Sequence, residues 1–374
     1  MPVFSTRSRS DRARTGGSRR PARVHLLPGT ALALTAAVLT TGCGLAESDS
    51  DRIAGAAAAA SSAPPSAPSA STTPHDAART PSGTPAAPAT SATPPPARML
   101  TDAARRVRPT LAPENGETVG VGQPVSLVFP HQKVDPALRA GIEGRLRIST
   151  STGVTGAWHW AEAKGATHLH FRPREFWPRG TRVELDARLD GVRLDDRTAA
   201  VGDRRLRFTI GDAMVSTVDL SAHTMTVVRN GRTLRTIPVS GGEERFRTRD
   251  GIKTVLSKDG TVLMDSLTIG IPRTSPDGFY DRYRWSMRET VSGEYVHAAP
   301  DNAEAFGKRN VSHGCIGMSE ADAEWLYRLS RKGDVIKAVG SSGKPMDRFG
   351  NGYGDWNISW SEWVRGSALG ELPT

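Results

Sequence analysis

A long stretch that cannot form a hydrophobic core divides this chain of 374 residues into two parts. From Glu47 to Ala97 the sequence is mostly Ala, Ser, Pro and Thr, with few aromatic residues and no periodic apolar face. Such a composition buries too little apolar surface to offset the chain entropy that is lost on folding. Folded structure is therefore expected only from about Pro109 onward, over roughly two or three domains.

The first 42 residues have the layout of an export signal. An Arg-rich stretch runs to Arg23, an apolar segment covers residues 26–39, and small residues precede Cys43. The apolar segment is shorter than the roughly 20 residues of a membrane-spanning helix, which favours a secretory signal. The small residues before Cys43 resemble a lipobox, so cleavage and lipidation at Cys43 are predicted. A plain export signal with an incidental cysteine is the alternative.

Most of the excess basic charge belongs to this leader. The whole chain has 49 basic and 39 acidic residues and a net charge of +10. Residues 1–42 contain seven Arg, no Lys and one Asp, so their removal leaves 42 basic residues against 38 acidic ones, a net charge of +4. The remaining chain is mildly basic and lacks a repeated pattern of basic and aromatic residues, which argues against a nucleic-acid partner.

Residues 109–211 alternate short β-like runs with turn signals, as is typical of a small β-sandwich. His168 and His170 would share one face of a strand. No third metal ligand is evident, so no metal is predicted there, and a half-buried strand face is the ordinary explanation. The strands are expected at Val125–Phe129, Leu146–Ile148, Thr167–Phe171, Arg182–Leu185 and Leu206–Ile210.

Residues 212–340 are also predicted to be mainly β, with one clear helix. Asn230-Gly231, between two alternating runs, predicts a tight hairpin. Ser319 and Asp322 have the spacing of an N-cap and the third helical residue ahead of an apolar face. A strand is expected after this helix, over residues 334–339.

The last segment, residues 341–374, is rich in tryptophan. Trp356, Trp360 and Trp363 follow the i, i+4, i+7 spacing of one apolar helical stripe. This stripe is expected to pack the tail on the body of the protein. The alternative is that it borders a binding site.

Apart from Cys43, Cys315 is the only cysteine of the sequence, and it stands in the run Ser312-His313-Gly314-Cys315. An unpaired cysteine in an exported protein is unusual, because cysteines there are generally paired. Together with His297 it supplies a thiol and a base, the parts of a cysteine nucleophile suited to acyl transfer. The alternative is that Cys315 is a small buried hydrophobic residue.

The local sequence around Cys315 suits such chemistry. Gly314 permits a sharp turn, and the helix predicted after Ser319 begins close by. Backbone N–H groups in a turn before a helix N-terminus favour both a thiolate and an oxyanion.

These residues carry a resemblance to a known family. His297, a gap of fourteen residues and then Ser312-His313-Gly314-Cys315 resemble the signature of the L,D-transpeptidases, whose YkuD-type catalytic domain cross-links bacterial peptidoglycan. The similarity runs from about Pro109 to the end. It implies a mainly β protein: an Ig-like sandwich, a β-rich YkuD-type catalytic domain with one clear helix, and a Trp-rich tail. The further similar segments are 264–266, 275–278, 292–300 and 354–360.

The resemblance assigns roles to several residues. It implies that His297 is the base, oriented by a backbone carbonyl near Ala298, and that the N–H groups of Gly314 and Cys315 form the oxyanion hole. His313 is implied as a site residue that either supports the turn or takes part directly. The substrate contacts that it implies are Ser312, Gly317, Phe279 and Met264.

Two features depart from the family pattern. Position 317 is Gly where Asn or Arg is usual. Ile269 and Phe279 stand where related members often have Tyr in a lid over the site. Substrate binding is therefore expected to differ from that of related members, whereas the nucleophile and the base are present.

The reaction implied is an acyl transfer without a cofactor. Cys315 would attack a tetrapeptide stem, form a thioester and pass the acyl group to an amine of a neighbouring stem, giving a 3-3 cross-link. Carbapenem-type β-lactams are the implied inhibitors. Two alternatives remain: an L,D-carboxypeptidase or endopeptidase that uses water in the second step, and a non-enzymatic wall-binding lipoprotein.

The expected location is outside the cytoplasm, with a lipid on Cys43 in the membrane and the folded domains facing the cell wall. Residues 43–108 would then form the disordered linker. A coil of about fifty residues spans on the order of 40 Å, and more where proline keeps it extended. A linker with no preferred reach is equally consistent with this composition.

Overall fold

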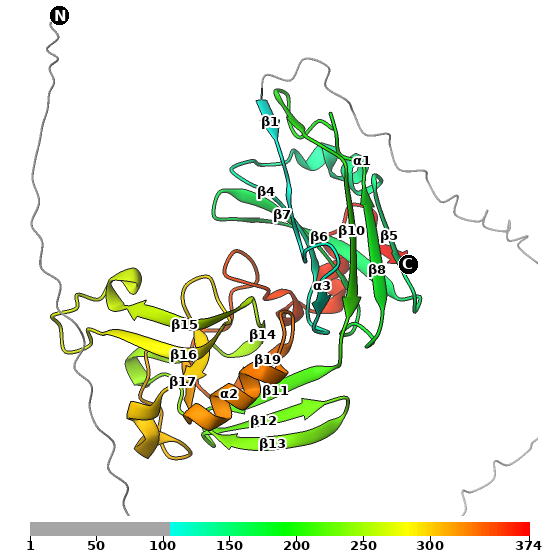
Figure 1. Ribbon diagram of the computed structural model, residues 1–374. Helices are drawn as coiled ribbons and strands as arrows, with labels where there is room; N and C mark the ends of the chain where they lie inside the picture. The colour runs from blue at the N-terminus through cyan, green and yellow to red at the C-terminus, as the bar shows by residue number, and fades with distance from the viewer. Residues whose placement is uncertain (1–104) are drawn as a thin grey trace, which may run out of the picture. The chain divides into compact units, whose positions relative to one another are not determined.

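The computed structural model describes residues 105–374, drawn in colour in Figure 1. The predicted signal, Cys43 and nearly all of the predicted linker lie outside the described residues. Within residues 105–374, no helix combines the length and the apolar character that crossing a bilayer requires.

The first part of the described chain is a β-sandwich, as predicted. One sheet has the strand order β3-β10-β8-β5 and the other β2-β4-β7-β6-β20. The first sheet consists of β3 (Thr118–Val119), β10 (Arg204–Ile210), β8 (Arg182–Ala187) and β5 (Leu146–Thr150). The second consists of β2 (Thr110–Ala112), β4 (Val125–Phe129), β7 (Ala166–Pro173), β6 (Thr155–Ala163) and β20 (Glu371–Pro373).

All five strands predicted for the sandwich are present within β4, β5, β7, β8 and β10. Smaller elements complete this part of the chain. Strand β1 (Arg105–Val107) pairs in parallel with β9 (Thr198–Ala200), and a 3₁₀ turn, η1 (Pro136–Leu138), leads into helix α1 (Arg139–Glu143).

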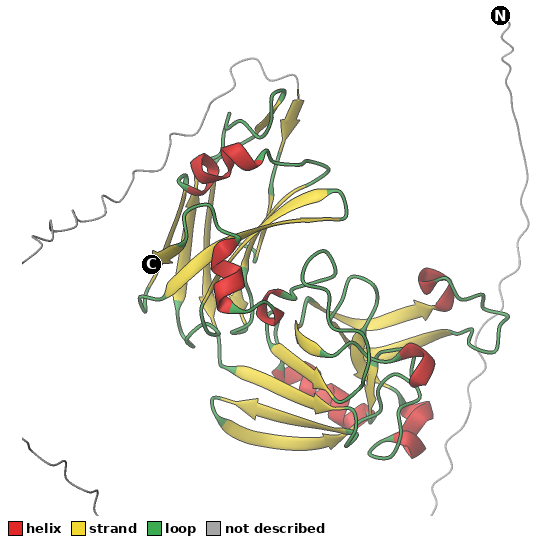
Figure 2. Ribbon diagram, turned by 180° about the vertical axis from the view of Figure 1, so that it is seen from behind, coloured by secondary structure: helices red, strands yellow, loops and turns green. Residues whose placement is uncertain are grey.

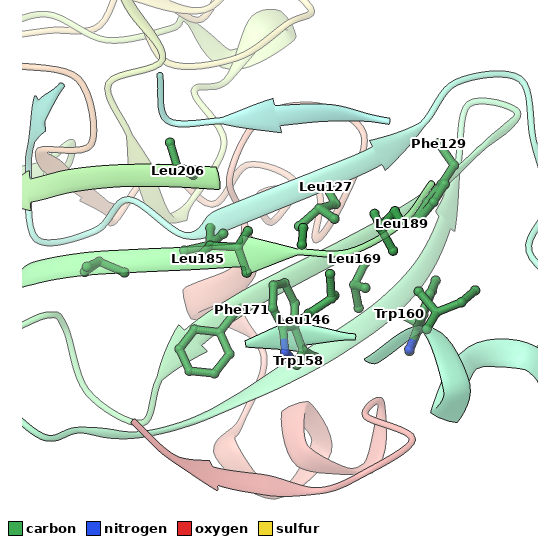
Figure 3. Packing of buried hydrophobic residues seen from close by; sticks show 14 of the residues in the cluster. Leu127, Phe129, Leu146, Trp158, Trp160, Leu169, Phe171, Leu185, Leu189 and Leu206 are labelled. Atoms are coloured by element: carbon green, nitrogen blue, oxygen red, sulfur yellow. The ribbon is translucent and has the colours of Figure 1, made fainter. Parts of the chain in front are cut away.

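Large apolar side chains fill the space between the two sheets, as Figure 3 shows. The alternating residues of β4 and β7 place Leu127 and Leu169 in this core, where both are fully buried. Trp158 of β6 is also fully buried and meets Phe171 edge to face, with ring centroids 5.3 Å apart. Full burial of a side chain of this size contributes about 1.5–3 kcal/mol or more to folding, so this core is the main source of the sandwich's stability.

The second part is built on two further sheets (Figure 1). The first has the order β13-β12-β11-β19-β14, from β13 (Arg232–Pro238), β12 (Thr224–Arg229), β11 (Met214–Asp219), β19 (Val335–Val339) and β14 (Gly251–Thr254). The second has the order β15-β16-β17-β18, from β15 (Ser257–Asp265), β16 (Tyr280–Arg288), β17 (Tyr295–Ala298) and β18 (Ile316–Met318). Helix α2 (Glu320–Leu329) packs against β16 and β17.

The local predictions for this part are confirmed. Asn230 and Gly231 both have positive φ, 52° and 80°, which is the geometry of a two-residue hairpin between β12 and β13. The Ser319 hydroxyl accepts from the Asp322 N–H at 3.1 Å and caps α2. The strand expected after the helix is β19.

The tail differs from the expected helix. Trp356 lies in a 3₁₀ turn, η5 (Asp355–Asn357), whereas Trp360 begins helix α3 (Trp360–Arg365), so the prediction of one helical stripe is wrong. The Ser359 side chain caps α3 and starts a new helix after the extended residue Ile358.

The packing role of the tryptophans is confirmed. The guanidinium carbon of Arg172 on β7 lies 4.5–5.4 Å from the ring centroids of all three. The tail returns to the sandwich, where β20 pairs with β6. Figure 2 shows the C-terminus next to the strands of the sandwich. His170, like Arg172, lies on β7 and is buried. Its Nδ1 is 2.6 Å from Asp355 Oδ1, so this histidine takes part in the packing of the tail.

Candidate active site

The predicted base lies on one of two paired parallel strands, and the predicted nucleophile directly precedes the other. In the β17–β18 pair, His297 lies opposite Gly317, and Cys315 directly precedes β18. The fourteen-residue gap in the motif is therefore the connection that a parallel crossover requires. It includes the 3₁₀ segment η4 (Pro300–Ala305).

The environment of His297 makes it a neutral base. Its Nδ1 lies 2.8 Å from the Ala298 carbonyl oxygen, as predicted. Because a carbonyl only accepts, Nδ1 must carry the proton, and the lone pair of Nε2 is left to accept one. The side chain is buried and packs on Tyr283, with ring centroids 4.5 Å apart. Burial lowers the pKa of His297 to about 4, so the ring is uncharged at neutral pH.

Cys315 is held as a thiol. Burial raises its pKa to about 12, and the nearby carboxylates of Glu294 and Glu289 act in the same direction. Its Sγ lies 3.7 Å from the Gly293 carbonyl oxygen, a distance that suits a weak S–H···O bond. The backbone N–H of Tyr295 also hydrogen bonds to the sulfur and works against the rise in pKa. Within the described residues no hydrogen bond joins the thiol to His297. The resting pair is therefore neutral, and proton transfer must accompany attack on a substrate.

A set of short hydrogen bonds fixes the turn before Cys315. Gly314 has φ 117°, which a residue with a side chain rarely adopts, so glycine is required here. The Ser312 hydroxyl donates to the Cys315 carbonyl at 2.6 Å and accepts from the Gly314 N–H at 3.1 Å. Thr248 Oγ1 donates to the Gly314 carbonyl at 2.9 Å. Ser312 thus holds the turn rather than facing a ligand.

This turn bears on the predicted oxyanion hole. The Cys315 N–H has no hydrogen bond to another described residue and is free for a substrate oxygen. The Gly314 N–H is already engaged by Ser312, so it would have to share or leave that bond.

A cavity of about 990 Å³ is lined by Cys315 and His313, whereas His297 is not among its lining residues. The hairpin of β15 and β16, with η3 (Ser266–Ile269) and the loop that follows it, forms an apolar wall over it. The predicted lid residues Ile269 and Phe279 are part of this wall, and so is Met264. The opposite side is mainly basic and is lined by Arg245, Arg247, Arg249 and Lys344.

His313 lies between two aromatic rings. Its centroid is 4.5 Å from that of Phe246, in the 3₁₀ turn η2 (Glu244–Phe246), and 4.9 Å from that of Phe279. His313 thus links the lid to the far wall of the cavity. Its Nε2 is buried without a hydrogen-bond partner in the described part of the chain.

Gly317 occupies a different place from the one predicted. It does not line the cavity, and its N–H and carbonyl both bond with Ser240, at 2.8 and 2.9 Å. A Cβ added at Gly317 would lie 3.0 Å from the Ala299 Cβ. A larger residue here would press on strand β17 before it reached a ligand.

Several residues of the site escaped prediction. Arg245 forms a bidentate ion pair with Asp277 of the lid loop, with N–O distances of 2.9 and 2.6 Å. Lys253, Glu289 and Glu294 form a buried charged cluster beside Cys315. Charged residues are ordinarily solvated, so the sequence carried no signal for this burial.

Comparison with known proteins agrees with this geometry. A family model described as a bacterial Ig domain matches residues 86–193, and one described as the L,D-transpeptidase catalytic domain matches residues 213–337. L,D-transpeptidase 1 of Mycobacterium tuberculosis is 38% identical over 231 residues, which cover 62% of this chain and 84% of the relative. The chain therefore belongs to the L,D-transpeptidase family.

Further relatives agree. L,D-transpeptidase 2 of Mycobacterium tuberculosis is 34% identical over 265 residues, 71% of this chain and 63% of the relative, so this chain spans less than two thirds of that protein. The solved structure of LD transpeptidase LdtMt1 in complex with imipenem gives a TM-score of 0.53 at 37% identity, covering 63% of this chain and 99% of that one. L,D-transpeptidase 3 of Mycobacterium tuberculosis, in complex with a faropenem-derived adduct, gives 0.51 at 32% identity, covering 62% and 97%.

Proposed function

We propose that this protein is a peptidoglycan L,D-transpeptidase that forms 3-3 cross-links through a thioester on Cys315. One observation carries the proposal: the sole cysteine of the described residues lines a large cavity just before β18, and the strand paired with β18 carries a histidine whose Nδ1 is fixed by a carbonyl. The membership of the family supports the substrate class. The free Nε2 of His297 supports the role of this residue as the base.

The first half of the reaction starts from a neutral thiol. His297 Nε2 takes the thiol proton as Sγ attacks the carbonyl carbon of the third residue of a donor tetrapeptide. The carbonyl oxygen becomes an oxyanion that the Cys315 N–H stabilises. The C–N bond to the terminal D-Ala then breaks, His297 returns the proton to the leaving amine, and a thioester remains.

The second half reverses these roles. The amine of an acceptor stem attacks the thioester carbonyl and His297 takes a proton from it. The C–S bond then breaks, and His297 returns this proton to the leaving sulfur, which restores the thiol. If water takes the place of the amine, the outcome is hydrolysis, which is the carboxypeptidase or endopeptidase alternative. The apolar side chains of Met264, Ile269 and Phe279 line the cavity on one side, and this apolar lining favours the acceptor amine over bulk water.

The same thiol would be the target of inhibitors. Two relatives have been solved with imipenem and with a faropenem-derived adduct. A carbapenem should therefore acylate Cys315 and add its full mass to the peptide that contains this residue.

The anchor belongs to the same proposal. Lipidation at Cys43 would hold the protein on the outer face of the cell membrane, with the linker extending toward the cell wall. In a detergent extract the wild-type protein should partition with the detergent, and Cys43→Ser should release it or stall its processing. Full partition of the wild-type protein into water would refute the anchor.

The test of function is digestion and mass spectrometry of muropeptides incubated with the purified protein. Dimers joined between the third residues of two stems are expected with the wild-type protein and absent with Cys315→Ala. Shortened stems without dimers would indicate the hydrolase. Unchanged muropeptides with a folded wild-type protein would indicate a wall-binding role without catalysis.

A further inference from the structure

A cluster of charged side chains lies in the interior beside the active site. Lys253 of β14 and Glu289, which follows β16, both have fully buried side chains, and the Glu294 side chain is only 8% exposed. The Lys253 Nζ lies 3.1 Å from Glu289 Oε2 and 3.8 Å from Glu294 Oε2. Arg249 completes the cluster, with Nη1 3.1 Å from Glu294 Oε1.

The two glutamates are the ends of one tight turn. Residues 289–294 connect β16 to β17, and the Glu289 N–H donates to the Glu294 carbonyl at 2.9 Å. The Glu294 N–H donates to Thr290 Oγ1 at 2.9 Å. Lys253 therefore touches both ends of the turn from a neighbouring sheet.

This turn also contacts the thiol. Its Gly293 carbonyl oxygen is 3.7 Å from Cys315 Sγ, and Glu294 lies near Gly314, where an added Cβ would be 3.6 Å from Glu294 Oε1. A shift of the turn would move the thiol's hydrogen-bond partner. The cluster therefore reaches the thiol through the Gly293 carbonyl of this turn.

Burial of three charges is expensive, and the cluster is not fully hydrogen bonded. Glu289 Oε1 and Glu294 Oε2 are buried without hydrogen-bond partners within the described residues. Apolar residues of similar volume generally serve stability as well as a buried ion pair or better. A role in the reaction therefore explains the cluster better than stability does.

We propose that Lys253 is a positioning residue for the reaction of Cys315: its ammonium group ties both ends of the Glu289–Glu294 turn, whose Gly293 carbonyl contacts the thiol, and its charge stabilises the thiolate. The inference rests on the proposed nucleophilic role of Cys315. Lys253 acts through the turn and the local field, and it does not touch the substrate.

The two signs of charge in the cluster should act in opposite directions. Lys253 favours the thiolate, whereas Glu294 and Glu289 oppose it. A cluster with only a structural role would behave otherwise. Substitution of either the lysine or a glutamate would then disturb the turn and lower the reactivity of the thiol. The titratable and charged groups that surround Cys315 are Arg249, Lys253, Tyr283, Glu289, Glu294, Tyr295, His297 and His313.

The test is the rate of Cys315 alkylation by iodoacetamide as a function of pH, in the full chain. The rate is followed by mass spectrometry of the peptide that contains Cys315, so that Cys43 does not interfere. Lys253→Met should lower the rate at pH 7.5 by about threefold to tenfold, as a shift of about one pKa unit would do. Glu294→Gln should raise it by a similar factor.

Two further variants make the outcome decisive. Glu324→Gln on the surface of α2 breaks an exposed ion pair with Arg328 and should leave the profile unchanged. Lys253→Met combined with Glu289→Leu removes one charge of each sign and should return the rate toward that of the wild type. If Lys253→Met fails to fold, the inference is tested by the Glu294→Gln variant alone: a higher alkylation rate supports it, and a lower or unchanged rate overturns it.

Opposite shifts from Lys253→Met and Glu294→Gln would support the inference. A lower rate in both variants, or no change in either, would overturn it, while the loss of cross-linking in Cys315→Ala would still stand. Cross-linking that persists in Cys315→Ala would instead refute the proposed function, whatever the alkylation profiles show.

Discussion

The sandwich and the catalytic domain use their interiors differently. Between the sheets of the sandwich the buried side chains are large and apolar, such as Trp158, Leu127 and Leu185. The catalytic domain has an apolar core too, but beside Cys315 it buries Lys253 and Glu289 completely. The sandwich core therefore serves stability, whereas the second domain gives up stability locally to set the charge and position of a thiol.

The largest effect is expected from a substitution at the active site of the catalytic domain. His297→Ala removes the base that accepts the thiol proton and should lower kcat/KM for cross-linking by roughly 10²–10⁴-fold. The rate of Cys315 alkylation near neutral pH should fall as well. Steady-state kinetics and thermal unfolding of the same preparation check this, and an intact fold with undiminished turnover would contradict it.

The second prediction concerns a substitution in the core of the sandwich. Trp158 is fully buried against Phe171, so Trp158→Ala should cost about 3–5 kcal/mol of the free energy of unfolding. Urea unfolding measures this loss. Below the transition, the alkylation profile of Cys315 should match that of the wild type. A changed profile would mean that the two interiors are coupled.

The third prediction concerns pH. Burial lowers the pKa of His297 from 6.5 to about 4, so below pH 6.5 the unfolded chain binds a proton here that the folded chain does not. The stability from this site is present above pH 6.5 and is lost as the pH falls toward 4, by about 3 kcal/mol. Unfolding at pH 7 and pH 4.5 measures the loss. His297→Gln should show a smaller loss, and an equal loss would contradict the account.

The smallest effect concerns the lid. Arg245 and Asp277 join the two sides of the cavity through an exposed ion pair, whose contribution to stability is small. Arg245→Gln should change KM by about twofold to fivefold and leave the unfolding temperature unaltered. High salt should bring the wild-type KM toward that of the variant. Arg328→Gln, which breaks a pair on α2, is the matched control.

Local patterns predicted most of the fold. Alternation and turn residues predicted the strands of the sandwich, and Asn230-Gly231 and Ser319 marked a hairpin and a helix start that the structure contains. Strand β20 escaped because it has only three residues and pairs with β6, more than two hundred residues earlier in the chain. The spacing of the tryptophans suggested one helix, but Ile358 and Ser359 interrupt it.

The site was predictable only where a motif marks it. His297 and Cys315 stand in the motif, and the carbonyl partner of His297 is where the resemblance implied it. The burial of Lys253 depends on strands that meet only in the folded chain. The substrate role expected for Gly317 does not match its place, because it is not among the residues that line the cavity and both of its backbone polar groups bond with Ser240.

The central claim is that Cys315 carries the acyl group. The most direct measurement is peptide mass spectrometry after brief incubation of the full chain with a tetrapeptide donor and no acceptor. We expect the peptide that contains Cys315 to gain the mass of the donor less its terminal D-Ala, and added amine to remove this adduct as the cross-linked product appears. A wild-type protein that forms cross-links with no adduct at Cys315, and continues to do so after Cys315→Ala, would contradict the account.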